Sequence, residues 1–121
     1  MISLQRTFIE TEIFQKRWKE IGLNENDLLY LQLVLLDNPK KGNMIQRTGG
    51  IRKLRFIIDN NKGKSGGARV CYLDFAEYEV TYLITAFSKD EKENLSDNER
   101  NILKKLANEL KKEAKKSYGK G

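Results

Sequence analysis

Three stretches of the chain place hydrophobic residues at the spacing of one helical face. In residues 12–21 the apolar side chains fall at i, i+4 and i+7. Residues 25–37 are apolar around almost the whole circumference, which predicts a mostly buried second helix. The third stretch, after residue 96, predicts a C-terminal helix, and we expect the basic tail at 115–121 to fray. A candidate capping residue precedes each helix: Thr11, Asn24 and Ser96.

Four other segments have the composition and alternation of strands: residues 4–10, 51–58, 69–75 and 79–87. A glycine- and lysine-rich link joins the second segment to the third, and a short turn joins the third to the fourth. The predicted order is therefore β-α-α-β-β-β-α. Consecutive strands with hairpin links favour a mostly antiparallel sheet, with the two early helices on one face. We expect an α+β fold in a single domain over residues 1–121.

Composition excludes several classes of protein and of catalytic site. Hydrophobic residues make up 39% and charged residues 33% of the chain, which suits a folded domain and not a disordered one. Because histidine is absent, Ser-His-Asp and Cys-His catalysis and imidazole zinc sites are excluded. A single cysteine, Cys71, excludes a disulfide framework. We therefore expect neither a metal nor another cofactor.

No segment is apolar over the roughly 18 consecutive residues that a membrane helix needs. The first residues, Met-Ile-Ser-Leu-Gln-Arg, lack the apolar run of a signal peptide. We therefore expect a cytoplasmic protein that has no membrane partner.

The net charge of +6 originates in the central third of the chain. Residues 40–72 have nine basic side chains against Asp59 alone, whereas the charges before them balance to −2 and those after them to zero. Clustered positive charge favours a polyanionic partner, because neutralising phosphates releases counterions. The nine basic residues are Lys40, Lys41, Arg47, Arg52, Lys53, Arg55, Lys62, Lys64 and Arg69.

Strand alternation predicts which of these side chains share a face. If the apolar residues of 51–58 pack beneath the helices, Lys53 and Arg55 point away from them, and matching parity also turns Arg69 outward. This face then holds three cations with Lys89 just past its end, which suits phosphate binding, and an aromatic ring on it can stack on a base. In the last strand, Tyr82, Ile84 and Ala86 are expected to point inward, and the outward residues to be Thr81, Leu83, Thr85 and Phe87.

Three runs of sequence resemble the RelE/HigB toxins of bacterial type II toxin–antitoxin modules. They read Gly-Gly-Ile-Arg-Lys-Leu-Arg at 49–55, Gly-Lys-Ser-Gly-Gly-Ala-Arg-Val-Cys-Tyr at 63–72 and Tyr-Leu-Ile-Thr-Ala-Phe-Ser-Lys-Asp-Glu-Lys at 82–92. The N-terminal Phe-Ile-Glu-Thr-Glu-Ile-Phe and the Asn-Pro pair at 38–39, followed by Gly42, resemble the HigB branch. The resemblance extends over about residues 5–112, and the order and spacing of the runs make it specific.

The resemblance implies a microbial-ribonuclease-like fold and the activity of an mRNA interferase, an endoribonuclease that cuts mRNA in the ribosomal A site without a metal. In such toxins the 2′-OH attacks its own 3′ phosphate and leaves a 2′,3′-cyclic phosphate. The implied partners are a cognate antitoxin that neutralises the toxin, the ribosome and its mRNA. Operator DNA is expected to bind only through the complex with the antitoxin.

Carried over by position, the resemblance implies four catalytic residues. Lys53 is the candidate general base, and Arg55 and Arg69 would stabilise the charge that develops on the phosphate. Lys89 is the candidate proton donor or phosphate clamp. Some members have a tyrosine a few residues later, whereas residues 90–95 contain none, which leaves proton transfer open to Glu91 or Glu93. Further contacts to RNA or ribosomal phosphates would come from Arg47, Arg52, Lys62, Lys64 and, by stacking, Phe87.

Two other functions compete with this interpretation. The related ParE toxins share the fold and poison DNA gyrase, but they have no need for a phosphate-cleaving cluster of cations. A basic RNA-binding sheet without catalysis would bind RNA with a steep dependence on salt and cleave nothing.

Overall fold

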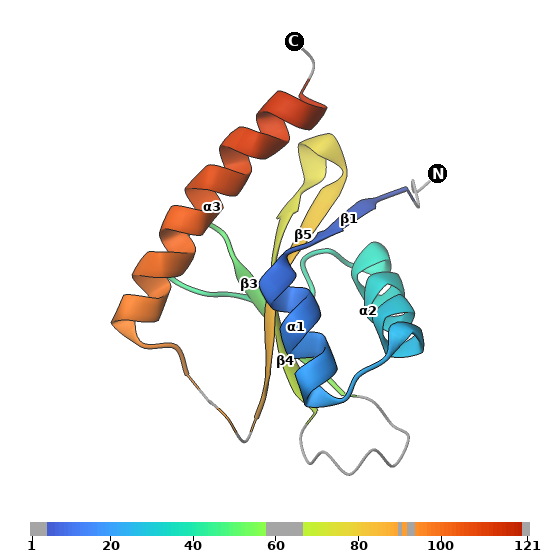
Figure 1. Ribbon diagram of the computed structural model, residues 1–121. Helices are drawn as coiled ribbons and strands as arrows, with labels where there is room; N and C mark the ends of the chain where they lie inside the picture. The colour runs from blue at the N-terminus through green and yellow to red at the C-terminus, as the bar shows by residue number, and fades with distance from the viewer. Residues whose placement is uncertain (1–4, 58–66, 90, 92–93, 120–121) are drawn as a thin grey trace.

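A five-stranded sheet forms the centre of the molecule and has helices on both faces (Figure 1). The computed structural model describes residues 5–57, 67–89, 91 and 94–119. The α+β class and the predicted order of elements are confirmed, with one additional short strand, β2, inside the expected loop. In chain order the elements are β1 (Thr7–Glu10), α1 (Glu12–Ile21), α2 (Glu25–Asp37), β2 (Asn43–Met44), β3 (Arg52–Phe56), β4 (Ala68–Phe75), a 3-10 helix (Ala76–Tyr78), β5 (Val80–Ser88) and α3 (Asp97–Tyr118).

The strands lie in the order β1-β5-β4-β3-β2 across the sheet. β1 runs parallel to β5, and β2 runs antiparallel to β3. The antiparallel pairs β3–β4 and β4–β5 confirm the prediction for the three consecutive strands. β1 pairs with β5 only as far as Leu83. Beyond that point α1 satisfies the backbone of β5: Thr11 donates from its backbone N–H to the carbonyl of Leu83 (3.1 Å) and from Oγ1 to that of Ile84 (2.7 Å).

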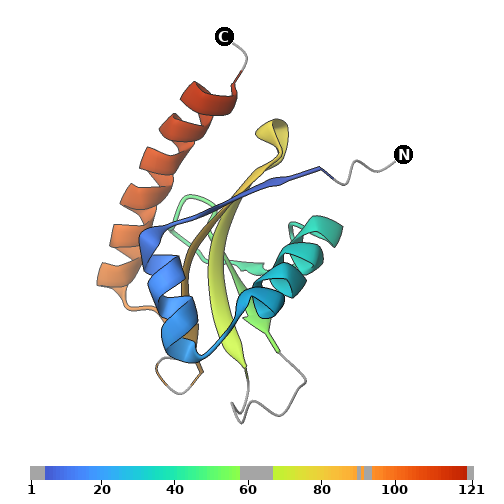
Figure 2. The ribbon, with the colours of Figure 1, turned by 45° about the vertical axis from the view of Figure 1, so that its right-hand side comes forward.

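The two faces of the sheet have separate hydrophobic cores. α1 and α2 cover one face, and α3 lies across the other (Figure 1 and Figure 2). The core under α1 and α2 consists of Phe14, Trp18, Ile21, Leu31, Leu35, Leu54, Phe56, Val70, Tyr72, Leu83 and Ala86. The core under α3 consists of Ile45, Ile51, Cys71, Leu73, Phe75, Val80, Tyr82, Ile84, Phe87, Leu103, Ala107, Leu110 and Ala114.

The second core corrects the expectation of an open sheet face. Apolar side chains on both faces of a sheet need cover on both, and the apolar stripe of α3 supplies it on the second face. Tyr82 ties the helix to the sheet, because its hydroxyl donates to Oε2 of Glu113 at 2.8 Å. α3 extends to Tyr118, into the basic tail at 115–121 for which fraying stays a prediction.

All three predicted caps are present. Oγ1 of Thr11 accepts from the backbone N–H of Phe14 at 3.0 Å and begins α1, which ends at Gly22 in the left-handed conformation. Asn24 and Ser96 each form a reciprocal capping box with the acidic residue three positions later. These local signals fix where the helices start, since each satisfies backbone donors that the helix itself leaves unpaired.

α2 differs from the prediction in its burial. Only Asp27, Leu31 and Leu35 are buried, while Leu29 and Leu33 are more than half exposed. The expectation of a mostly buried helix is therefore wrong. α2 has the sheet on one side, and a helix that packs against one layer buries only one stripe of side chains.

A β-bulge in β5 changes the facing of its first half. Cys71 pairs with Thr85 and Tyr72 pairs with Leu83, so Ile84 is an extra residue on β5. As a result Tyr82 and Ile84 join the core under α3, and Leu83 joins the core under α1 and α2. The predicted facing was wrong for these residues and correct for Ala86 and Phe87, which lie beyond the bulge.

No helix in the described part of the chain is long and apolar enough to cross a membrane.

Candidate functional site

The central strands bring the predicted cations together on the α3 side of the sheet. Leu54, Phe56 and Val70 pack beneath α1 and α2, so the residues alternating with them face the other way. Two cross-strand rows result. One row is Lys53, Cys71 and Thr85, and the other is Arg55, Arg69 and Phe87.

The three cations of these two adjacent rows, which we together call the cationic row, are Lys53, Arg55 and Arg69. Arg55 and Arg69 are directly opposite each other across β3 and β4. Like charges in such a position repel, so an anion bound to both guanidinium groups would relieve the repulsion. Arg69 is buried, with 7% exposed, whereas Arg55 is exposed to solvent. The acidic residue of β4, Asp74, is at the other end of the strand, where it accepts from Thr81 at 2.6 Å.

Cys71 lies next to the cationic row and is fully buried. Burial raises the pKa of its thiol from 9.0 to about 12, although the positive charge of Lys53 opposes this shift. The thiol is therefore neutral at physiological pH and is not a nucleophile. Within the described residues, no group of three or more histidine, cysteine, aspartate or glutamate side chains is arranged to hold a metal ion.

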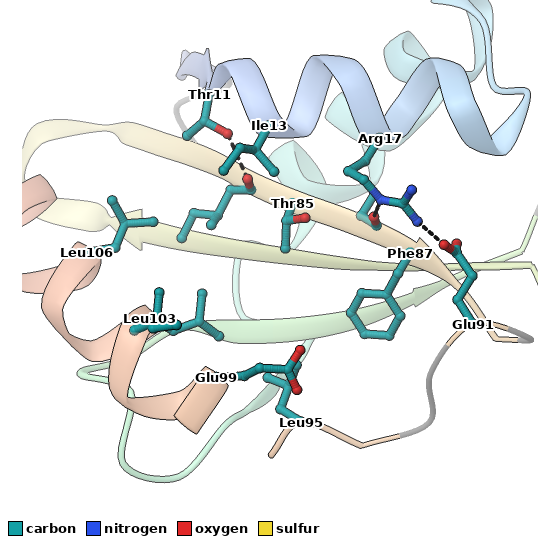
Figure 3. Close-up of a pocket in the computed structure, with 13 residues that line it drawn as sticks. Thr11, Ile13, Arg17, Thr85, Phe87, Glu91, Leu95, Glu99, Leu103 and Leu106 are labelled. Atoms are coloured by element: carbon teal, nitrogen blue, oxygen red, sulfur yellow. Dashed lines mark hydrogen bonds and ion pairs between the residues drawn. The ribbon is translucent and has the colours of Figure 1, made fainter. Parts of the chain in front are cut away.

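A pocket of about 590 Å³ opens beside Phe87, between α1, the second half of β5 and the start of α3 (Figure 3). Phe87 lines it but is itself buried, with 7% exposed, so its ring has little free face for stacking on a base. Most of the lining is apolar. The residues that line it are Thr11, Ile13, Arg17, Ile84, Thr85, Ala86, Phe87, Glu91, Leu95, Glu99, Ile102, Leu103 and Leu106.

Lys89 follows β5 directly and is exposed. It lies in a turn that the side chains of Glu91 and Arg17 connect to the end of β5. Oε1 of Glu91 accepts from the backbone N–H of Ser88 at 2.8 Å, and its Oε2 pairs with Nη2 of Arg17. Nε of Arg17 donates to the carbonyl of Ala86 at 3.1 Å (Figure 3). Sequence reasoning missed Arg17, because its partner Glu91 is 74 residues away along the chain and no local pattern links the two.

These contacts also define the state of Glu91. The hydrogen bond from the backbone of Ser88 lowers the pKa of its carboxyl group most, and the hydrogen bond from Arg17 lowers it further. A carboxylate held in the ionised form accepts a proton less readily, which disfavours Glu91 as the proton-transfer group. The alternative, Glu93, lies outside the described residues.

The predicted accessory contacts are dispersed. Arg52 faces away from Lys53 and donates from Nη1 to the carbonyl of Gly42 at 2.8 Å, so it braces the loop before β2. Arg47 is exposed, has a positive φ of 65° and pairs with Asp97 at 3.3 Å. These contacts join Arg52 and Arg47 to groups outside the cationic row. Lys62 and Lys64 lie outside the described residues.

Comparison with known proteins agrees with the fold. Residues 6–119 match the family model described as the RelE toxin of the RelE/RelB toxin–antitoxin system. A mutant of the Escherichia coli toxin RelE in the free state has a TM-score of 0.51 and 18% identity, over 72% of this chain and 86% of that one.

A conserved hypothetical protein from Helicobacter pylori, HP0892, gives a TM-score of 0.49 and 16% identity, over 72% of this chain and 98% of that one. The HigB branch stays a prediction, because neither comparison separates the branches of the family. The match to the family model extends over almost the whole chain, and the chain belongs to the RelE toxin family of toxin–antitoxin systems.

Proposed function

We propose that this toxin is a ribosome-dependent endoribonuclease that cleaves mRNA in the ribosomal A site without a metal and thereby inhibits translation. The observation that carries the proposal is the direct opposition of Arg55 and Arg69 on one face of the sheet, with Lys53 in the neighbouring row. Side chains of directly opposed residues start from neighbouring backbone positions, and each guanidinium can donate two parallel hydrogen bonds, so the pair suits one phosphate.

The proposed reaction is an internal transfer at phosphorus. In the reacting state Lys53 is the unprotonated amine: the 2′-oxygen loses its proton to this amine and forms a bond to the adjacent phosphorus, while the bond to the 5′-oxygen breaks. Lys89 returns a proton to that leaving oxygen, and the product is a 2′,3′-cyclic phosphate. Arg55 and Arg69 stabilise the extra negative charge on the non-bridging oxygens, which is greatest in the transition state.

The absence of histidine from this site supports the proposed dependence on the ribosome. Histidine, whose pKa suits proton transfer at neutral pH, is absent from the chain. Part of the rate enhancement must then come from the alignment of the 2′-oxygen with the phosphorus and the leaving oxygen. A partner that holds the mRNA in this geometry can supply it, because alignment lowers the entropic part of the barrier.

The test is cleavage of a reporter mRNA in a reconstituted translation system, with naked RNA as control. We expect cuts that require ribosomes, persist in EDTA and leave 2′,3′-cyclic ends, and that decrease about 100-fold or more in Arg69→Ala and Lys53→Ala. Absence of cleavage while cells still arrest growth would favour a gyrase poison. Absence of both would leave a basic binding module.

The partner of the free toxin is proposed to be an antitoxin with an acidic or amphipathic segment that covers the basic surface of residues 40–72. Membership of the RelE family supports an antitoxin partner, and the charge of this region supports an acidic one. Operator DNA would then be bound by the complex. Pulldown of the tagged toxin expressed from its native operon should recover a small protein in addition to ribosomes, and recovery of ribosomes alone would contradict the proposal.

A further inference from the structure

We propose that Arg17 and Glu91 form a clamp that positions Lys89 relative to the cationic row. The inference rests on the proposed function, because it assigns these two residues to the proton-transfer side of the same site. Neither residue belongs to the cationic row. Both would act through Lys89 and are therefore positioning residues.

The need for a clamp follows from where the sheet ends. Ser88, opposite Ala68, is the last residue of β5 that pairs with β4, and Lys89 comes directly after it. Among the described residues, the pairing of β5 with β4 ends at Ser88, so the ladder does not fix the direction of the backbone at Lys89. The position of the Lys89 ammonium group therefore depends on the geometry of the turn from Ser88 to Glu91.

Glu91 closes this turn on both sides. Its carboxylate accepts from the backbone N–H of Ser88 at 2.8 Å, and its own backbone N–H donates to the carbonyl of Ser88 at 3.1 Å. These two bonds return the chain to the end of β5 within three residues. Lys89 lies along the chain between Ser88 and Glu91, the two residues that these bonds join.

Arg17 connects the closed turn to the rigid part of the fold (Figure 3). Its Nε donates to the carbonyl of Ala86, and its Nη2 donates to the carboxylate of Glu91. Arg17 thus binds one group before Lys89, the carbonyl of Ala86, and one group after it, the carboxylate of Glu91. α1 holds that side chain firmly, because Phe14 and Trp18 on the same helix are buried in the core.

Electrostatics and burial indicate a local role for the clamp. The hydrogen bond from Ser88 and the bond from Arg17 lower the pKa of Glu91, so the carboxylate stays charged at neutral pH and the ion pair persists. The side chains of Arg17 and Glu91 are 26% and 44% exposed. Ion pairs this exposed contribute little to the stability of a fold, so breaking this one should alter the turn and leave the core intact.

The experiment is single-turnover cleavage of mRNA on stalled ribosomes at saturating toxin, with circular dichroism and thermal melting of each variant. We expect Glu91→Ala and Arg17→Ala to lower the cleavage rate roughly 10- to 100-fold, as a displaced catalytic group does, without changing the toxin concentration at half-saturation. Glu91→Gln keeps the acceptor for Ser88 but loses the ion pair, so its cleavage rate should lie between those of the wild type and Glu91→Ala.

A double-mutant cycle separates positioning from an independent effect. In the Lys89→Ala background, Glu91→Ala should cause no further loss, because the group that it positions is already gone. The matched control is Glu20→Ala, which removes the other carboxylate bound to Arg17, at 2.6 Å, and should stay within about twofold of wild type.

Several outcomes would overturn the clamp while leaving the nuclease intact. These are full activity of Glu91→Ala, full activity of Lys89→Ala, or a loss in the double variant equal to the product of the two single losses. If the wild type cleaves nothing, the proposed function has failed, and amide hydrogen exchange tests the clamp by itself. Glu91→Ala should then speed exchange at Ser88 and spare Val70 in the core, and unchanged exchange at Ser88 would reject the clamp.

Discussion

Arg69 and Arg55 have opposite exposures although they face each other across two strands. Arg69 is buried and loses most of its hydration on folding, whereas Arg55 remains in solvent. A buried guanidinium is useful where a planar fork of donors must keep one orientation. The buried member of the pair should therefore tolerate replacement less well than the exposed one, even when the charge is kept.

Substitution by lysine tests this difference. We expect Arg69→Lys to reduce ribosome-dependent cleavage roughly 10- to 100-fold, because an ammonium group cannot reproduce the bidentate fork. Arg55→Lys is the matched control and should lose less than Arg69→Lys. Single-turnover rates measure both, and equal losses would contradict a greater dependence on the guanidinium at the buried position.

The buried thiol of Cys71 gives a prediction about pH and stability. Folding raises its pKa from 9.0 to about 12, so between these values the unfolded chain has lost this proton and the folded chain keeps it. The free energy of unfolding must then fall as pH rises through this window, by about 1.4 kcal/mol per pH unit from this group. Urea unfolding at several pH values should show a shallower decrease in Cys71→Ala, and an identical slope would reject the shifted pKa.

Elements differ in how far the sequence alone determined them. The helix starts at Thr11, Asn24 and Ser96 were predictable because a cap is a contact within a few residues. The bulge at Ile84 was not, since it depends on which residues of β4 pair with β5. Likewise, the facing of Lys53 and Arg69 was predictable from strand alternation, but the clamp between Arg17 and Glu91 joins residues far apart in the chain.

α2 illustrates the same limit and offers a test. Its leucines are alike in sequence, yet Leu33 is 54% exposed and Leu35 is 1% exposed. We expect Leu35→Ala to lower the free energy of unfolding by about 2–5 kcal/mol through the cavity that it leaves. Leu33→Ala is the matched control and should change it by about 0.5 kcal/mol or less. Chemical denaturation measures both, and similar costs for the two would contradict the packing of this helix.

At the scale of the whole molecule, three positive charges lie together on β3 and β4, on the face of the sheet that α3 covers. The chain has a net charge of +6, and the cationic row contributes three positive charges within two adjacent strands. Such a surface attracts RNA over a distance and also forms short-range contacts with its phosphates. The dependence of binding on salt distinguishes these two effects.

Binding of a single-stranded RNA oligonucleotide, followed by fluorescence anisotropy at several salt concentrations, measures that dependence. Arg55→Gln should reduce the slope of log affinity against log salt by about 0.7, the value for one lost phosphate contact on a single strand. The control Lys104→Gln removes the same charge from the exposed side of α3 and should leave the slope nearly unchanged. Equal reductions would mean that net charge alone drives binding.

The parallel pairing of β1 with β5 determines when the active toxin can exist during its own synthesis. β1 is the first strand to leave the ribosome, yet its partner, Val80–Leu83, is made more than 70 residues later. Pairings this distant in sequence form late and slow the folding of a domain. Arg69 and Lys89 likewise take their places only when β4 and β5 have paired. Under the proposed function, a nascent toxin therefore cannot assemble its site, or act on the ribosome that makes it, until β5 has been translated.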